Sequence, residues 1–129
     1  MDYDLIIVGS GPAGIFTALE LIKRNSKKKI LLIEKGKPVE KRHCPKSETG
    51  HCVNCKPSCA ITTGFSGAGA FSDGKLSLSY EVGGDLPTLI GEDFAQELID
   101  YTDKIYLEFG ADSKIEGIGT GDAIKEIRK

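Results

Sequence analysis

The sequence predicts an α/β fold in which parallel strands pack against flanking helices, and three features lead to this prediction. The first is an apolar run at residues 4–8 that ends directly at a glycine-rich turn, residues 9–14. The second is a helical pattern of apolar residues at 15–22, and the third is another apolar run at 29–34. Strand, turn, helix and strand in this order are the parts of a βαβ unit, which places its two strands in parallel.

The two apolar runs are continuous and do not alternate with polar residues. This pattern is typical of strands that are buried on both faces of a parallel sheet. In the helix between them, four apolar residues share one face, namely Ile15, Ala18, Leu19 and Ile22. Pro12 falls near the first turn of this helix, where a missing N–H has no cost.

Length and composition limit the kind of protein. The chain has 129 residues, which is the length of one domain and predicts a single hydrophobic core. Hydrophobic residues make up 40% and charged residues 28%, which excludes a disordered chain. No apolar run approaches the ~20 residues that span a membrane, and Asp2 and Asp4 replace the basic start of a signal peptide. We therefore expect a cytoplasmic protein without a membrane partner.

The turn after the first strand has the pattern Gly-x-Gly-x-x-Gly, formed by Gly9, Gly11 and Gly14. The first glycine permits a tight turn, the second lets the backbone approach a diphosphate, and the third lets the helix pack closely on the strands. Glu34 ends the second strand, where a carboxylate can accept hydrogen bonds from both ribose hydroxyls and repel a 2′-phosphate. In this strand–turn–helix context the pattern predicts a Rossmann-type dinucleotide-binding fold. The pattern alone does not separate FAD from NAD.

Several segments resemble flavoproteins. Residues 3–14 together with residues 33–36 resemble the N-terminal FAD-binding segment of the glutathione-reductase-like flavoproteins. Three further segments resemble the FAD-dependent dehydrogenases, also called NAD(FAD)-utilising dehydrogenases: Arg42–Pro45, Cys52–Cys55 and Gly67–Leu76. The resemblance implies a partial Rossmann-type FAD/NAD(P)-binding domain with FAD as cofactor. It also implies NAD(P)H as an electron donor of the full-length protein.

The resemblance also implies which residues contact the cofactor. The glycine-rich turn would meet the diphosphate, Glu34 the adenosine ribose and Lys35 the adenine end. Backbone amides of residues 67–70 would stabilise negative charge on the reduced flavin, with Ser72, Asp73 and Lys75 lining the site unless they form an ordinary polar turn. The expected contacts are Gly9, Gly11, Pro12, Ala13, Gly14, Glu34, Lys35, Arg42, Gly67, Ala68, Gly69 and Ser72.

Flavoproteins of this kind are several hundred residues long, so the resemblance implies that residues 1–129 are the N-terminal, incomplete part of an FAD-binding domain. Its expected parts are the βαβ fingerprint at 1–36, a cysteine-rich loop at 37–63, a glycine-rich flavin loop at 64–79 and a helix at 92–109. The full-length protein is expected to be an FAD-dependent oxidoreductase of unknown substrate. The isolated chain, without the rest of the flavoprotein, is expected to bind FAD weakly and to be inactive. The alternatives are a non-catalytic nucleotide-binding or metal-binding module and a protein like the flavin disulfide reductases.

All cysteines of the chain lie in one short segment, with the pattern C-x7-C-x2-C-x3-C: Cys44, Cys52, Cys55 and Cys59. Nothing indicates secretion, which argues against structural disulfides. Three interpretations remain. The cysteines form a tetrahedral site for zinc or an iron–sulfur cluster, or a redox-active dithiol, or they are free thiols in a loop. Residues 49–55 resemble the cysteine segment of flavin disulfide reductases, where the two cysteines are further apart. We expect His43 and His51 to be loop residues and not ligands.

The charge of the chain is unevenly distributed. Residues 1–75 carry 12 Lys or Arg and 7 Asp or Glu, a balance of +5, whereas residues 76–129 carry 5 and 12, a balance of −7. The basic excess between Lys23 and Lys46 contains no aromatic residue on which a base could stack, which argues against nucleic acid as a partner. An anionic ligand such as a diphosphate accounts for it better.

The rest of the chain is less specific. Residues 80–87 contain Gly83, Gly84 and Pro87 and predict a loop, and residues 111–120 predict irregular structure or a short strand. The helix at 92–109 is amphipathic, and we expect its apolar stripe to be core: Phe94, Leu98, Tyr101, Ile105 and Phe109. Asp122 is expected to cap a final helix.

Overall fold

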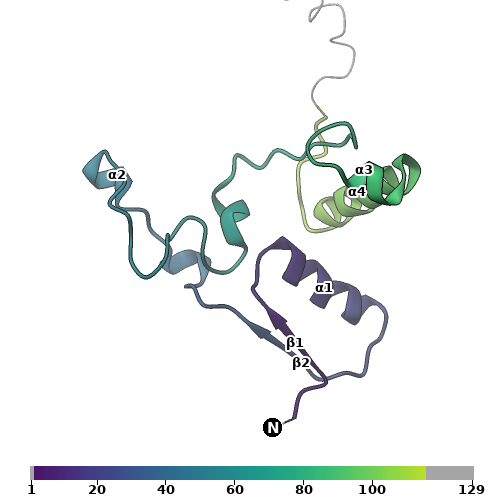
Figure 1. Cartoon of the computed structure of the whole chain (residues 1–129), viewed down its shortest axis with the longest axis horizontal. Coiled ribbons are helices and arrows are strands. Elements are labelled where there is room, and N and C mark those ends of the chain that lie inside the picture. The colour runs from purple at the N-terminus through teal and green to yellow at the C-terminus, as the bar shows by residue number, and fades with distance from the viewer. Residues whose placement is uncertain (1, 116–129) are drawn as a thin grey trace, which may run out of the picture. The chain divides into compact units, whose positions relative to one another are not determined.

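The computed structural model describes residues 2–115 (Figure 1). The chain divides into two compact units, residues 1–75 and residues 76–129, and each is described by itself. Within the first unit the strands and the helix between them contact one another, and within the second two helices do so. The final helix expected after Asp122 lies outside the described residues.

The first unit contains the predicted strand, helix and strand. Strand β1 is Leu5–Val8, helix α1 is Pro12–Lys23 and strand β2 is Ile30–Ile33. The strands pair in parallel, with Leu5 opposite Ile30 and Val8 opposite Ile33. Helix α1 contacts both strands and runs beside them in Figure 1. The described residues therefore confirm a small α/β unit with two parallel strands, which is the coarse form of the predicted fold.

The strands are less buried than the sequence predicts. Ile7 is 9% exposed, but its neighbours Ile6 and Val8 are 54% and 83% exposed. Ile33 at the end of β2 is 44% exposed. Because successive side chains of a strand point to opposite faces, α1 buries one face of β1 and leaves the other open. The prediction that both faces are buried is therefore wrong for the described residues.

The segments predicted as loops contain short helical turns. Helix α1 itself begins at Pro12, three residues before the predicted start, with Gly11 as its N-cap. The cysteine-rich segment contains the 3-10 helix η1, Val39–Lys41, and the helix α2, Lys46–Thr49. The glycine-rich segment contains the 3-10 helix η2, Gly67–Phe71.

The second unit is built from two helices, α3 at Leu86–Ile90 and α4 at Glu92–Glu108. Helix α4 confirms the predicted helix to within one residue at its end, and Gly110 with a φ of +93° follows it. Helix α3 was not predicted, because Gly83, Gly84 and Pro87 indicate a loop. Proline is compatible with the first turn of a helix, and Pro87 occupies that turn here. No helix among the described residues is long and apolar enough to cross a membrane.

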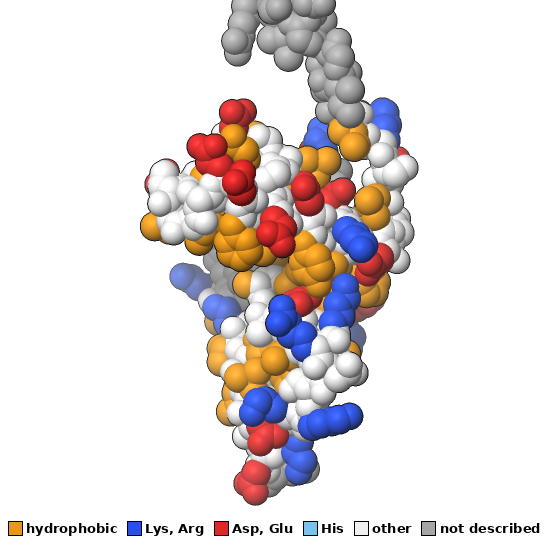
Figure 2. Space-filling view, turned by 90° about the vertical axis from the view of Figure 1, so that its right-hand side faces the viewer, with side chains coloured by type: hydrophobic (Ala, Val, Ile, Leu, Met, Phe, Trp, Pro, Cys, Tyr) orange, Lys and Arg blue, Asp and Glu red, His pale blue; other side chains and the backbone are white. Residues whose placement is uncertain are grey.

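The apolar stripe of α4 is only partly buried. Ile105 is 3% exposed and is accompanied in the core by Ala95, whereas Phe109 is 74% exposed and Phe94 is 49% exposed. The prediction that the whole stripe forms the core is therefore wrong. Helix α3 has five residues and contacts only part of the 17-residue α4. Figure 2 shows hydrophobic side chains among charged ones on the surface that it draws.

Candidate functional site

The glycine-rich turn connects β1 to α1 in the predicted way. The amide of Gly9 donates to the carbonyl of Ile33 at 2.7 Å, and Gly9 itself has a φ of +99°, which favours glycine. A Cβ on Gly14 would overlap the carbonyl oxygen of Gly9 and lie 3.3 Å from the Cγ2 of Ile7. Only glycine at this position therefore allows α1 to approach β1 this closely.

Gly11 faces open space at the N-terminus of α1. No heavy atom lies within 4 Å of the position that a Cβ on Gly11 would occupy. The helix has no side-chain cap, and the first amides of a helix have no partner within the helix. Because Pro12 has no amide hydrogen, the amides of Ala13 and Gly14 are the ones that can bind an anion here. The positive end of the helix dipole favours such an anion.

The carboxylate of Glu34 is fixed beside this turn. Its Oε2 accepts hydrogen bonds from the amide of Ser10 at 2.9 Å and from the Ser10 hydroxyl at 3.1 Å. Its Oε1 accepts from the amide of Gly36 at 2.8 Å. The Ser10 amide, followed by the Gly36 amide, lowers the pKa of Glu34 below its ordinary value. Glu34 is therefore ionised at neutral pH and lies beside the glycine-rich turn at residues 9–14, where the sequence places it.

Ser10 is a site residue that the sequence analysis missed. Its side chain is fully buried, and both its donors engage one oxygen of Glu34. A carboxylate has about four acceptor positions, and these bonds with the Gly36 amide use three of them. Binding of both ribose hydroxyls therefore requires the Ser10 hydroxyl to turn away. The available signal was its place between two fingerprint glycines.

The glycine-rich segment at 64–67 lies against the fingerprint, although more than 50 residues separate them in the sequence. The amide of Ser66 donates to the carbonyl of Ser10 at 2.8 Å, and a Cβ on Gly67 would lie 3.4 Å from the Cα of Gly11. The amide of Phe65 donates to the carbonyl of Lys37 at 3.1 Å, just after β2. The fold thus brings parts of both glycine-rich segments together, and their contact with a cofactor stays a prediction.

Arg42 holds the second glycine-rich segment in place. The side chain is 6% exposed, and its guanidinium carbon lies 4.7 Å from the centroid of the Phe71 ring. Its N–H groups donate to four backbone carbonyls: Ala60 at 2.8 Å, Phe65 at 2.6 Å, Gly67 at 2.8 Å, and Ile61. Four of the five donors of a guanidinium are thereby used within the chain. The structure gives Arg42 a positioning role, and direct contact with a cofactor stays a prediction.

The remaining expected contacts are exposed or engaged locally. Lys35 follows β2 and is exposed, as are Ala68 and Gly69 in η2. The hydroxyl of Ser72 accepts from the amide of Gly74 at 3.1 Å. Asp73 pairs with Lys75 at 3.1 Å, and this hydrogen-bonded cation lowers the pKa of Asp73. Ser72, Asp73 and Lys75 thus form a local polar turn, and their contact with a cofactor stays a prediction.

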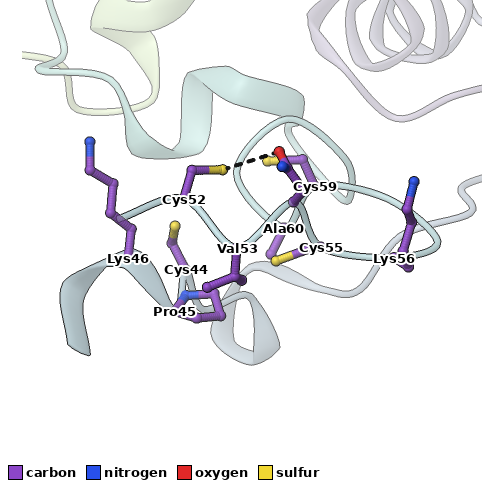
Figure 3. A pocket seen from close by; sticks show the side chains of 10 residues that line it. Cys44, Pro45, Lys46, Cys52, Val53, Cys55, Lys56, Cys59 and Ala60 are labelled. Carbon is purple, nitrogen blue, oxygen red and sulfur yellow. Dashed lines mark hydrogen bonds between the residues drawn. The ribbon is translucent and has the colours of Figure 1, made fainter. Parts of the chain in front are cut away.

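The four cysteines are free thiols that line one pocket of about 540 Å³ (Figure 3). Among the described residues, no group of three or more His, Cys, Asp or Glu side chains is close enough together to hold a metal ion. The metal interpretation therefore finds no assembled ligand set there. His43 contacts Glu48 at 3.0 Å and His51 contacts the carbonyl of Thr49 at 2.8 Å. Both histidines are thus engaged within their own loop.

The lowered pKa of Glu34 predicts a dependence of stability on pH. A carboxylate with a lowered pKa in the folded state stabilises the protein above its unfolded pKa of about 4.3. This contribution is lost as the pH falls through the folded pKa. Glu34→Gln should therefore lower the urea midpoint at neutral pH, and the difference from the wild type should shrink in acid. Glu40→Gln, at an exposed position of η1, is the control. Parallel pH profiles of wild type and Glu34→Gln would contradict the assignment.

One curated protein, an uncharacterized protein of Clostridium beijerinckii, is 39% identical to this chain over 72 residues. The match covers 56% of this chain but only 13% of that protein, so the chain spans a small part of its relative's length. No family model matches the chain, and no solved structure matches it.

Proposed function

We propose that this chain is an FAD-binding segment of a flavin-dependent oxidoreductase. The observation that carries the proposal is the ionised carboxylate of Glu34, held beside a glycine-rich turn in which Gly11 faces open space. A helix N-terminus suits a diphosphate, and an acid at the end of the second strand suits a ribose. These are the two polar parts of the adenine half of a dinucleotide. The choice of FAD over NAD rests on the resemblance of residues 3–14 to flavoproteins.

The residues present fit such a cofactor. The amides of Ala13 and Gly14 would bind the diphosphate, and the space beside Gly11 lets it approach the backbone. Glu34 would bind the ribose and, being negatively charged, disfavour a 2′-phosphate. A bound flavin supplies hydride or electron transfer, which is chemistry of the cofactor. The described residues bind and orient it.

Gly11→Val is expected to weaken FAD binding without unfolding the protein. The new side chain would fill the space that the diphosphate needs, since no protein atom lies within 4 Å of its Cβ. The φ of Gly11 is −73°, which any residue adopts, so the fold should tolerate the change. Quenching of flavin fluorescence measures the binding, and circular dichroism measures the fold. We expect the affinity to fall by at least ~10-fold, about 1.4 kcal/mol.

Ile22→Val is the matched control, because Ile22 is 68% exposed near the end of the same helix. It should bind FAD as the wild type does. Retention of full FAD affinity by Gly11→Val would contradict the diphosphate assignment. Binding of NAD but not FAD by the wild type would instead favour a non-catalytic nucleotide-binding module.

A further inference from the structure

None of the residues that line the cysteine pocket is among those proposed to bind FAD. Two thiols of the pocket face the same space. The side chains of Cys52 and Cys59 are both exposed and point toward each other in Figure 3. The thiol of Cys52 donates to the Oδ1 of Asn54 at 3.7 Å. Cys44 and Cys55 line the same pocket and are half-buried. A substrate can therefore reach Cys52 and Cys59 directly.

The environment of Cys59 stabilises a negatively charged sulfur. The backbone amides of Thr62 and Ile61 and the Thr62 hydroxyl favour the charged form of its sulfur, and the charge of Arg42 adds to their effect. Together they lower the pKa of the Cys59 thiol. The carbonyl of Cys59 accepts from the amide of Thr63 at 3.0 Å, which closes a turn over residues 59–63. The thiolate is the nucleophilic form of cysteine, and a lowered pKa increases the share of Cys59 that is in this form.

The charge of the pocket selects the kind of substrate. Lys46 and Lys56 line it, and no Asp or Glu is among the described residues that do so. Cations at the mouth of a pocket raise the local concentration of anions and their rate of encounter. A substrate that carries carboxylate groups is therefore favoured over a neutral one.

We propose that this pocket is a thiol–disulfide exchange site for small disulfides that carry carboxylates, with Cys59 as the nucleophile and Cys52 as the resolving thiol. In the first step the Cys59 thiolate attacks one sulfur of the substrate, forms a mixed disulfide and releases the other half as a thiolate. In the second step Cys52 loses its proton to water and attacks Cys59, which releases the remaining half. Two protein thiols are oxidised to one disulfide, and one substrate disulfide is reduced to two thiolates.

The proposal goes beyond FAD binding and does not depend on it. The nucleophile Cys59 lies outside residues 49–55, which resemble the cysteine segment of flavin disulfide reductases. The pocket, its two lysines and the turn at 59–63 are the features that support exchange at this site. Both steps take place on the protein without a flavin, so a failure here leaves the proposed dinucleotide site untouched.

The test uses the reduced full chain and one equivalent of 5,5′-dithiobis(2-nitrobenzoate), a disulfide with two carboxylates. We expect release of both halves of the reagent and a Cys52–Cys59 disulfide, identified by peptide mass spectrometry. Cys52→Ser should release one half and keep the other on Cys59. Cys59→Ser should slow the first release by ~10-fold at pH 7, because an ordinary thiol is only a few per cent ionised there. Cys55→Ser is the matched control and should retain both steps.

The neutral reagent 4,4′-dithiodipyridine tests the charge. Lys46→Gln combined with Lys56→Gln should slow the anionic reagent at low salt and leave the neutral reagent unchanged. Circular dichroism checks that each variant is folded. Three results would overturn the proposal: an unchanged first release in Cys59→Ser, release of both halves by Cys52→Ser, or tight retention of zinc by the reduced chain with loss of thiol reactivity. The last result would make the pocket a metal site.

Discussion

Gly14→Ala is expected to destabilise the first unit and to weaken FAD binding with it. The added methyl group would overlap the carbonyl oxygen of Gly9 and crowd Ile7. The overlapped atom belongs to the backbone, so no change of a side-chain rotamer relieves the overlap, and α1 has to move away from β1. Overpacking typically costs about 1–3 kcal/mol, against a total stability of about 5–15 kcal/mol for a domain. Urea unfolding followed by circular dichroism measures the loss.

Gly69→Ala is the matched control for Gly14→Ala. Nothing lies within 4 Å of the position of its Cβ, so this variant should keep the stability of the wild type. Comparison with Gly11→Val separates two roles of the glycine-rich turn, which are the approach of the diphosphate at Gly11 and the packing of the helix at Gly14. Gly11→Val should keep its stability but bind FAD more weakly, whereas Gly14→Ala should lose both stability and affinity for FAD. A wild-type unfolding midpoint for Gly14→Ala would show that the helix does not pack on the strand as closely as described.

Arg42→Met should have the other large effect, a loss on the order of 3 kcal/mol. The variant retains a long apolar side chain but leaves the carbonyls of Ala60, Phe65 and Gly67 without their donor. A hydrogen bond to a charged group contributes about 1.5–3 kcal/mol, and several are lost together. The unfolding free energy from urea titrations measures the total effect. Hydrogen exchange at the amides of Ser66 and Gly67 locates it.

Arg42→Lys distinguishes the planar guanidinium from a mere positive charge. An ammonium lacks the fork that reaches several carbonyls at once, so the lysine variant should recover only part of the stability. Lys41→Met, at an exposed neighbour in η1, is the control and should have little effect. Equal stability of the wild type and Arg42→Met would contradict the positioning role.

The sequence predicts the structure best where a short pattern contains its own physical cause. Residues 5–8 and 30–33 are strands because β-branched and apolar side chains follow one another without interruption. Position 14 requires glycine because a Cβ there would meet Gly9 and Ile7, which belong to the same βαβ unit. The burial of side chains is the property that the sequence predicts least well. The exposure of Val8 and Phe109 depends on which elements cover them, and a pattern along one strand or helix does not contain that information.

The order of strand, turn, helix and strand and the nearness of Glu34 to the fingerprint follow from the amino-acid sequence alone, because local periodicity and the parallel pairing of adjacent strands determine them. The partners of Arg42 and the burial of Ser10 emerge only when the chain is folded. They join residues far apart in the chain through backbone groups. Every residue has such groups, so no residue type in the sequence signals the contact.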